Sequence, residues 1–552
     1  MRLDFQRHGG PGWHRWRHYR GLLLTLSLTA ALASGAELGQ DPRPNIVLIV
    51  ADDLGYADLG SFGSRIRTPN IDHLASQGIR FTQFHTAPQC APTRAMLFSG
   101  NNNHVAGVGR QYPSALLSQH LPGYEGHLSD RVVPFPRLLR AAGYHTYIAG
   151  KWHLGKGAMQ SPKAAGFERS FVLTQGAGHH WHGKGFRKAG SLYREDGREV
   201  SWPEGAYSTE FYTDKLISYL EQDRDDDRPF LVVATYTSPH WPLQVPADEL
   251  QRYRGDYDVG YDALREENFA NLKAAGIVPQ QSELPPRNSA ITPWNALAPE
   301  DRRREARKME LYAAMVENLD THVGRLLDYL RQRDLYDETL VLFMSDNGAA
   351  QEDFYASGPY RAFIRANYDN AYEKMGTPES WVAYGAAWAE AGSAPFSRFK
   401  GYAREGGITA PLIIAGAGVT PRGVINRNYL TVMDLAPTFL EVGKADYPAD
   451  GYSVPLGNSM TGLLQGDATA LHGEDHVTTL YHRGHGFIRQ GFWKLVSLEP
   501  PFDESALKLF NLENDPGETT DLRDREPERY AALLELWRTR RVTYGIVLPQ
   551  DL

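Results

Sequence analysis

Continuous apolar runs constrain the fold of this chain more than any other feature of its sequence. They lie in the expected strands 44–51, 144–149, 230–236, 340–345 and 411–414, of which the second also contains the polar His145 and Thr146, and several are rich in β-branched side chains. Strands of a parallel sheet are buried on both faces, so they read as unbroken apolar runs rather than as alternating patterns. Helical stretches separate the runs. The sequence therefore predicts an α/β fold with a doubly wound, mainly parallel sheet that binds its ligand at the carboxyl edge.

Acidic and amide side chains directly follow two of these runs. Asp52 and Asp53 follow the first run, and Asp346 and Asn347 follow the fourth. Adjacent carboxylates at the end of a buried strand are costly unless a cation neutralises them. Because the two groups can meet across the sheet edge, we expect them to share one divalent cation. Oxygen donors suit Ca²⁺ or Mg²⁺ better than Zn²⁺, and we favour Ca²⁺.

The chain contains a single cysteine, Cys90, so it can form no internal disulfide. A lone cysteine is either a small buried residue or a reactive centre. If Pro92 opens a helix, Arg94 lies one turn away from Cys90. A cation and a helix N-terminus beside the sulfur would form an anion site, which favours a reactive role.

Cys90-x-Pro92-x-Arg94, followed by Leu97-x-Ser99-Gly100, resembles the signature of the type I sulfatases, which belong to the alkaline phosphatase superfamily. Ser99 is a mild departure, because the family more often has Thr before the closing Gly. The resemblance extends from Asn45 to the C-terminus and is strongest to bacterial arylsulfatases. It implies an alkaline phosphatase-like fold and hydrolysis of sulfate monoesters, aryl sulfates in particular. It also implies that a maturation system oxidises Cys90 to formylglycine.

Three further segments match the family in order: Gly150-Lys151-Trp152-His153, Ser238-Pro239-His240, and Lys400-Gly401 with Glu405-Gly406-Gly407. Glycines on both sides of the Lys-Trp-His element, Gly150 and Gly155, suggest a close backbone approach to a ligand. The resemblance implies a metal site made by Asp52, Asp53, Cys90, Asp346 and Asn347. It implies a catalytic set made by Cys90, Arg94, Lys151, His153, His240 and Lys400.

The family also implies roles for these groups. One hydroxyl of the hydrated aldehyde at position 90 attacks sulfur, with Asp346 as a base, and the other expels sulfate, with His153 as a base. His240 or Lys400 protonates the departing alcohol. Two alternatives stay open: a phosphonate or phosphodiester hydrolase of the same superfamily, and a non-catalytic anion- or glycan-binding protein in which Cys90 remains a thiol.

Residues 1–36 have the features of a secretory signal peptide. Five arginines precede the apolar run Leu22–Ala33, which is too short for a comfortable membrane span, and Ala31-Leu32-Ala33 offers a cleavage pattern. We expect an exported protein, periplasmic or secreted, with no membrane span in the mature chain. The lack of Asn-x-Ser/Thr sites favours a bacterial source. The net charge of -8 argues against nucleic acid as a partner, because proteins that bind nucleic acid usually carry an excess of basic residues.

The predicted domain boundary follows from a change along the chain, from long buried strands and helices to short strands and turns. We expect a catalytic domain over 42–444 and a smaller C-terminal α+β domain over 445–552, where short strands precede a terminal helix. Specificity for the alcohol half of the substrate should lie in residues 175–205 and 250–308, which we expect around the entrance. Residues 350–395 carry no readable motif.

Overall fold

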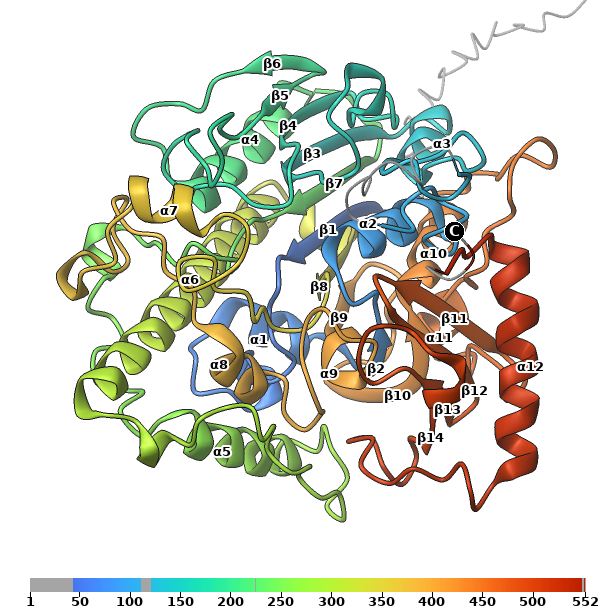
Figure 1. Ribbon diagram of the computed structural model, residues 1–552. Coiled ribbons are helices and arrows are strands. Elements are labelled where there is room, and N and C mark those ends of the chain that lie inside the picture. The colour runs from blue at the N-terminus through green and yellow to red at the C-terminus, as the bar shows by residue number, and fades with distance from the viewer. Residues whose placement is uncertain (1–42, 111–120, 224, 549–550, 552) are drawn as a thin grey trace, which may run out of the picture. The chain divides into compact units, whose positions relative to one another are not determined.

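The computed structural model describes residues 43–110, 121–223, 225–548 and 551 (Figure 1). The predicted signal peptide, residues 1–36, lies outside the described residues. Among the helices that are described, none is both long and apolar enough to cross a membrane.

The described chain is built on a ten-stranded sheet (Figure 1). Its strands are β1 (Asn45–Ala51), β2 (Gly78–His85), β3 (His145–Lys151), β4 (Arg169–Leu173), β5 (Tyr193–Glu195), β6 (Arg198–Val200), β7 (Phe230–Thr235), β8 (Thr339–Ser345), β9 (Thr409–Gly416) and β10 (Val424–Thr431). The strand order is β10-β2-β9-β8-β1-β7-β3-β4-β5-β6. Strands β8, β1, β7, β3 and β4 run parallel to one another, whereas β9 runs antiparallel to both of its neighbours. The predicted mainly parallel sheet is confirmed.

Two helical layers cover the two faces of this sheet. The helices are α1 (Pro69–Ser76), α2 (Cys90–Ser99), α3 (Phe135–Ala141), α4 (Ser208–Gln222), α5 (Tyr261–Ala274), α6 (Pro299–Gln332), α7 (Arg361–Asn367), α8 (Gly385–Gly392), α9 (Glu405–Ile408), α10 (Leu435–Val442), α11 (Thr461–Gln465) and α12 (Pro527–Tyr544). Side chains of α1, α4, α5, α6 and α8 share a core with Val47 and Ile49 of β1. Those of α2, α3, α10 and α11 share another with Ile46 and Leu48. The unbroken apolar run of β1 thus serves two cores, because successive strand residues point to opposite faces.

The long helix α6 begins earlier than the sequence pattern suggests. The run of apolar residues indicates a start at Met309, but the helix begins at Pro299, with Glu300 and Asp301 in its first turn. Proline at the first helical position and acidic residues beside the helix N-terminus are start signals. The first ten helical residues therefore belong to α6, although they fall within the segment 250–308 that was expected around the entrance.

A smaller C-terminal domain contains a four-stranded antiparallel sheet. Its strands β11 (Val477–His482), β12 (His485–Gln490), β13 (Trp493–Val496) and β14 (Lys508–Asn511) pair in that order. On one face Trp537 of α12 packs into a local core. On the other face Phe487 joins the core that holds α10 and α11. The small domain, with short strands before a terminal helix, is confirmed, and the boundary after residue 444 remains a prediction.

A buried group of charges joins the two sheets. Lys494 of β13 donates from Nζ to Glu405 Oε1 (2.6 Å) and lies 2.9 Å from Glu518 Oε1. Glu405 opens α9 and contacts His85 Nε2 at 2.8 Å. Burial raises the pKa of Glu405, but Lys494 and His85 outweigh it and hold that pKa well below its ordinary value. The carboxylate is therefore charged, and it fastens the start of α9 to the small sheet.

Replacing Lys494 by Met should lower the free energy of unfolding by about 3–5 kcal/mol, because Glu405 and Glu518 would stay buried without their shared cation. Urea denaturation followed by tryptophan fluorescence measures this change. Lys508→Met is the matched control: Lys508 pairs with Asp521 at 2.9 Å, but both side chains are about one-third exposed. Such a pair contributes less than about 1 kcal/mol. Equal losses in the two variants would contradict the importance of the buried group.

Candidate functional site

The strand ends bring the predicted residues to one edge of the large sheet. Strands β1 and β8 are parallel and pair Ala51 with Ser345, so the acidic pairs that follow them emerge side by side. On the other side of β1, β7 leads to the Ser238–His240 segment, and the backbone nitrogen of Asp52 donates to Ser238 O at 3.1 Å. The carboxyl edge of a parallel sheet thus forms the floor of the site, as expected.

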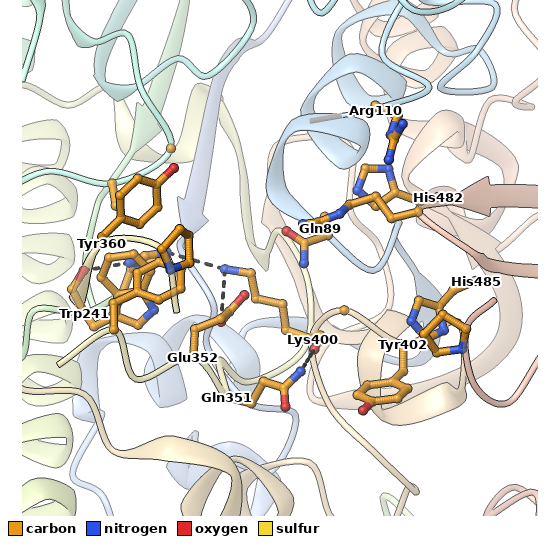
Figure 2. Close-up of a pocket in the computed structure, with 18 of the residues that line it drawn as sticks. Gln89, Arg110, Trp241, Gln351, Glu352, Tyr360, Lys400, Tyr402, His482 and His485 are labelled. Atoms are coloured by element: carbon orange, nitrogen blue, oxygen red, sulfur yellow. Dashed lines mark hydrogen bonds and ion pairs between the residues drawn. The ribbon is translucent and has the colours of Figure 1, made fainter. Parts of the chain in front are cut away.

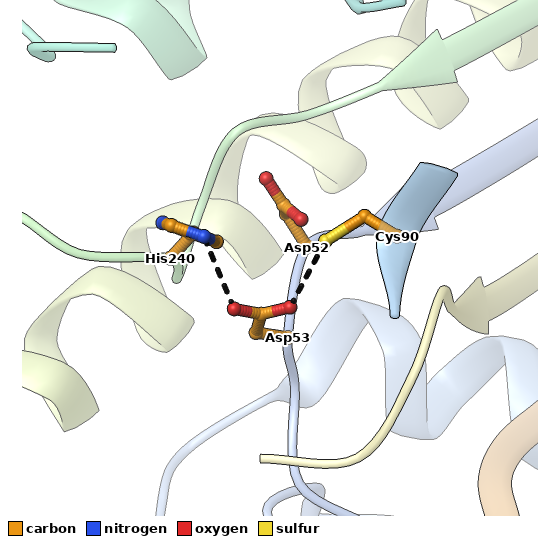
Figure 3. Close-up of side chains that lie close together, drawn as sticks. All are labelled: Asp52, Asp53, Cys90 and His240. Atoms are coloured by element: carbon orange, nitrogen blue, oxygen red, sulfur yellow. Dashed lines mark hydrogen bonds and ion pairs between the residues drawn. The ribbon is translucent and has the colours of Figure 1, made fainter. Parts of the chain in front are cut away.

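Asp53 is the residue that most of the other site groups contact (Figure 3). It is 1% exposed and has a left-handed backbone with φ of 64°. Its Oδ1 accepts from Asn347 Nδ2 at 2.6 Å and from Cys90 Sγ at 3.5 Å. Its Oδ2 accepts from Lys400 Nζ at 2.6 Å and lies 3.2 Å from His240 Nε2. Asp53 therefore joins four chain segments that are far apart in the sequence.

Two further buried ion pairs lie beside Asp53. Lys151 Nζ contacts both carboxylate oxygens of Asp52, at 2.6 and 2.8 Å. Arg94 donates to Asp346 Oδ2 from Nε at 3.0 Å and from Nη2 at 2.9 Å, and its Nη1 donates to Lys151 O at 2.6 Å. Arg94 is one helical turn beyond Cys90 in α2, as the sequence predicted. The site thus balances three cations against three carboxylates: Arg94, Lys151 and Lys400 against Asp52, Asp53 and Asp346.

Burial shifts the pKa values of the central groups. It raises the pKa of Asp52 despite Lys151, because a charged group loses its water. Burial also raises the pKa of Asp53, but Lys400, whose Nζ donates to Oδ2 at 2.6 Å, outweighs it and brings that pKa below its ordinary value. For Cys90, burial and then Asp346 raise the thiol pKa well above its usual range. The sulfur is therefore a neutral thiol, which is a weak nucleophile.

The donor set fits a hard divalent cation. One ligand atom from each of Asp52, Asp53, Cys90 and His240 lies within 4.8 Å of the other three (Figure 3). Asn347 adds an amide oxygen, Oδ1, which is buried and has no hydrogen-bond partner among the described residues. Carboxylate and amide oxygens are donors that Ca²⁺ and Mg²⁺ prefer. An orphaned buried oxygen beside clustered carboxylates is what a cation would satisfy.

Two predicted assignments differ from this grouping. His240, predicted to protonate the leaving group, stands among the possible ligands. Asp346, predicted as a ligand, stands outside that group of four; Arg94 holds its Oδ2, and its Oδ1 accepts from the backbone nitrogen of Asp53 at 3.2 Å. An oxygen that accepts one hydrogen bond still has a second lone pair. The roles of both residues therefore remain predictions.

The Lys-Trp-His element leaves the extended conformation after Lys151, the last residue of β3. His153 has a left-handed backbone, with φ of 60°. His153 is 5% exposed, and burial, followed by the charges of Lys151 and Arg94, lowers its pKa well below the ordinary value. The flanking Gly150 lies against a neighbouring strand: a Cβ there would be 1.8 Å from the carbonyl oxygen of Thr235. This glycine allows β3 to pack closely against β7.

A pocket of about 590 Å³ opens above Lys400 and His240 (Figure 2). Aromatic side chains form one wall: Phe186, Trp241, Phe354 and Tyr360. Cationic and imidazole side chains form another: Arg110, His482, Arg483 and His485. In Figure 2, Lys400 lies between Trp241 and Tyr360 on one side and Arg110 and His482 on the other. The pocket gives a substrate access to the buried site.

The origin of the pocket walls corrects one expectation. Residues 175–205 supply Phe186, as expected, but residues 250–308 supply no lining residue, because α5 packs into the core against α8 instead. Residues 351–360, which showed no motif, line the pocket. The turn between β11 and β12 does so too, and its Arg483-Gly484 pair has positive φ at both positions. Gly484 is the usual residue at the second position of such a turn, but Arg483 replaces the Asn, Asp or Gly of the usual hairpin signal, so the sequence does not reveal the turn.

Comparisons with known proteins agree on one family. Residues 44–445 match the profile of the family described as Sulfatase. An uncharacterized sulfatase of Schizosaccharomyces pombe is 35% identical over 533 residues, which are 93% of this chain and 96% of that protein. An arylsulfatase of Klebsiella aerogenes is 37% identical over 432 residues, 77% of this chain and 91% of that one. The crystal structure of Ps i-CgsB, at 23% identity, has a TM-score of 0.65 over 90% of this chain and 92% of that chain. It shows the shared fold.

If Asp53 is a ligand, Ca²⁺ should raise the melting temperature of the metal-free protein, and Asp53→Asn should abolish that rise. A ligand at 100 times its dissociation constant stabilises the folded state by about 2.7 kcal/mol. Differential scanning calorimetry after chelation, with Ca²⁺ or Mg²⁺ added back, measures the response. Glu352→Gln is the control, because Glu352 lines the pocket but lies outside the donor group. An unchanged response in Asp53→Asn would refute the site.

Proposed function

The chain belongs to the sulfatase family, and from this premise we propose that it is a sulfuric ester hydrolase that cleaves sulfate monoesters, aryl sulfates among them, to a phenol or alcohol and sulfate. The position of Cys90 carries the proposal. It opens α2 and touches Asp53, within the cluster of possible metal ligands. The aromatic wall of the pocket and the arylsulfatase relative support an aryl leaving group.

We propose that a maturation system converts Cys90 to formylglycine. A buried neutral thiol suits neither attack on sulfur nor the later release of sulfate. The hydrated aldehyde would supply two hydroxyls at that position, one for attack and one for release. The chain contributes the surroundings: the N-terminus of α2 favours negative charge, and Arg94 fixes Asp346 close to Asp53. Asp346 and His153 are the proposed bases.

One divalent cation, with Ca²⁺ favoured over Mg²⁺, would be held by Asp52, Asp53, Asp346, Asn347 and residue 90, and His240 lies close enough to join them. Such a cation supplies positive charge for the sulfate oxygens. Without it, the three basic side chains are neutralised by three aspartates. With it, the site has an excess of positive charge, which suits an anionic ester and the further charge that develops on the leaving oxygen.

The contacts of His240 support Lys400 rather than His240 as the proton donor for the leaving group. His240 Nδ1 lies 2.7 Å from Trp241 O, and a carbonyl only accepts, so this contact assigns the hydrogen to Nδ1. His240 Nε2 is then an acceptor, and it faces Lys400 Nζ at 3.4 Å. Burial opposes the charge of Lys400, but Asp53 outweighs it and raises the pKa of Lys400 well above its ordinary value. We therefore propose that Lys400 protonates the leaving oxygen and that His240 positions it.

We also propose that the protein is exported to a bacterial periplasm or secreted. The arginine-rich start and apolar run of residues 1–36 support this proposal. The proposed partners are a sulfate ester and the maturation system that modifies Cys90. We propose no nucleic-acid partner.

Mass analysis of the tryptic peptide Phe81–Arg94 should show an aldehyde in place of the thiol at position 90 in protein made with a maturation system. Cys90→Ala should lower aryl sulfate turnover by a factor on the order of 10³–10⁶, as loss of a nucleophile does. A phosphate diester and a phosphonate ester tested on the same preparation should turn over more slowly than the sulfate. Full turnover by Cys90→Ala, or by protein that retains the thiol, would sink the proposal.

Lys400→Ala should slow phenyl sulfate more than 4-nitrophenyl sulfate, because nitrophenolate leaves without needing a proton. A general acid contributes about 10²–10⁴-fold, and only the poorer leaving group should lose that full factor. Single-turnover rates with the two esters measure the difference. Lys151→Ala is the comparison variant, since Lys151 contacts Asp52 and not the pocket-facing His240. It should slow both esters to a similar extent, and an equal loss on both esters in Lys400→Ala would exclude the proton-donor role.

A further inference from the structure

The turn between β11 and β12 places an arginine in the wall of the catalytic pocket. Arg483 is exposed and lines the same pocket as Lys400. Its φ of 51°, followed by 89° at Gly484, is that of a two-residue turn with both central residues left-handed. Asn, Asp or Gly would adopt the first position more easily than Arg. The turn geometry does not require an arginine at this position. The side chain of Arg483 should therefore have a role of its own.

Arg483 contributes positive charge that no neighbouring acid neutralises. Within the described part of the chain it forms no ion pair, and its side chain donates no hydrogen bond to the protein. The acids of the same pocket do have cations: Glu499 pairs with Arg398, and Glu352 lies 3.8 Å from Lys400 Nζ. Arg110 adds a second guanidinium group to the wall.

Two imidazoles flank Arg483 and are buried where they meet the pocket. His482 is 1% exposed and His485 is 8% exposed. His485 Nδ1 is buried and has no hydrogen-bond partner among the described residues. Buried polar atoms are nearly always paired, so an unpaired one in a pocket wall points to a ligand. Burial, with Arg483 nearby, lowers the pKa of both histidines, so they are neutral groups that can donate one N–H each.

The aromatic wall stands opposite this group. In Figure 2, Trp241 and Tyr360 lie on one side of Lys400, and His482 and His485 lie on the other. A ring packed on the aromatic wall, with its sulfate ester directed at Lys400, would present its remaining substituents to the hairpin. A neutral substituent would leave the guanidinium and the imidazole without partners, whereas an anionic one would satisfy both.

We propose that the hairpin residues His482, Arg483 and His485 form a second anion subsite, and that the preferred leaving group carries an anionic substituent, a carboxylate or a second sulfate, besides the ester that is cleaved. This inference rests on the proposed sulfatase function, whose own groups lie deeper at the sheet edge. The small domain thereby selects the substrate, and the large sheet performs the hydrolysis.

Matched substrates test the subsite. 4-Carboxyphenyl sulfate is compared with its methyl ester, and 1,4-phenylene disulfate with phenyl sulfate, so that the two arms separate carboxylate from sulfate. The wild-type protein should have a higher kcat/KM for the anionic member of at least one pair. In Arg483→Asn, which tolerates the left-handed turn, the ratio of kcat/KM values within that pair should fall about tenfold to a hundredfold. Comparing this ratio between wild type and variant cancels the intrinsic reactivities of the two esters.

Two further variants control for charge and for the turn. Arg483→Lys keeps the charge and should retain part of the preference. Lys444→Asn removes an exposed cation from another left-handed position, with φ of 51°, outside the pocket, and should leave the ratio unchanged. A ratio that is the same in wild type and Arg483→Asn, or that falls equally in Lys444→Asn, would overturn the subsite.

Binding of the products separates this inference from the proposed function. Calorimetry measures the affinity of the wild-type protein and of Arg483→Asn for 4-hydroxybenzoate and for its methyl ester, with no chemical step involved. Tighter binding of the carboxylate that depends on Arg483 supports the subsite even if no ester is hydrolysed, in which case the sulfatase proposal alone fails. Hydrolysis without any preference, in turnover or in binding, overturns the subsite alone.

Discussion

The carboxylate of Asp53 is the contact on which the rest of the site depends. It is buried, and its two oxygens meet an amide, a thiol, an ammonium and an imidazole from four segments of the chain. Burying a charge is costly unless partners surround it, and here most of the partners are themselves polar and buried. The balance of three aspartates and three basic side chains keeps the buried charge of the protein groups close to neutral. The same balance means that a divalent cation would change the field at the sulfate position rather than merely neutralise the acids.

The sequence predicts where these side chains gather because the physics that brings them together is local. A buried strand must be continuous in apolar residues, so Asp52 and Asp346 stand out where two such strands stop, and the parallel pairing of β1 and β8 then brings them together. The pocket walls have no comparable signature. Residues 351–360 lack periodicity, and Arg483 becomes part of the pocket only because the small sheet packs against the large one. Glycine was also misread at position 150, since a missing Cβ fits a neighbouring strand as well as a ligand.

The small domain has two connections to the catalytic edge. One is the buried charge group, in which Lys494 of β13 holds Glu405 at the start of α9. The loop that carries Lys400 leads directly into this helix, so the small sheet restrains the loop that places the proposed proton donor. The other connection is the turn before β12, which brings Arg483 to the pocket. Because β12 and β13 are paired strands of one sheet, the fixed position of Lys494 also limits how far Arg483 can move.

This arrangement separates two demands that conflict in a single site. The centre needs charges that are buried and tightly paired, because the strength of a field at sulfur grows as water is excluded. Recognition of the leaving group needs side chains that remain open to solvent until a ligand arrives, as the exposed guanidinium of Arg483 does. If both sets lay on the carboxyl edge of the large sheet, the recognition groups would pair with the aspartates. Placing them on a second sheet keeps them apart from those acids while the Lys494 contacts hold them in register with Lys400.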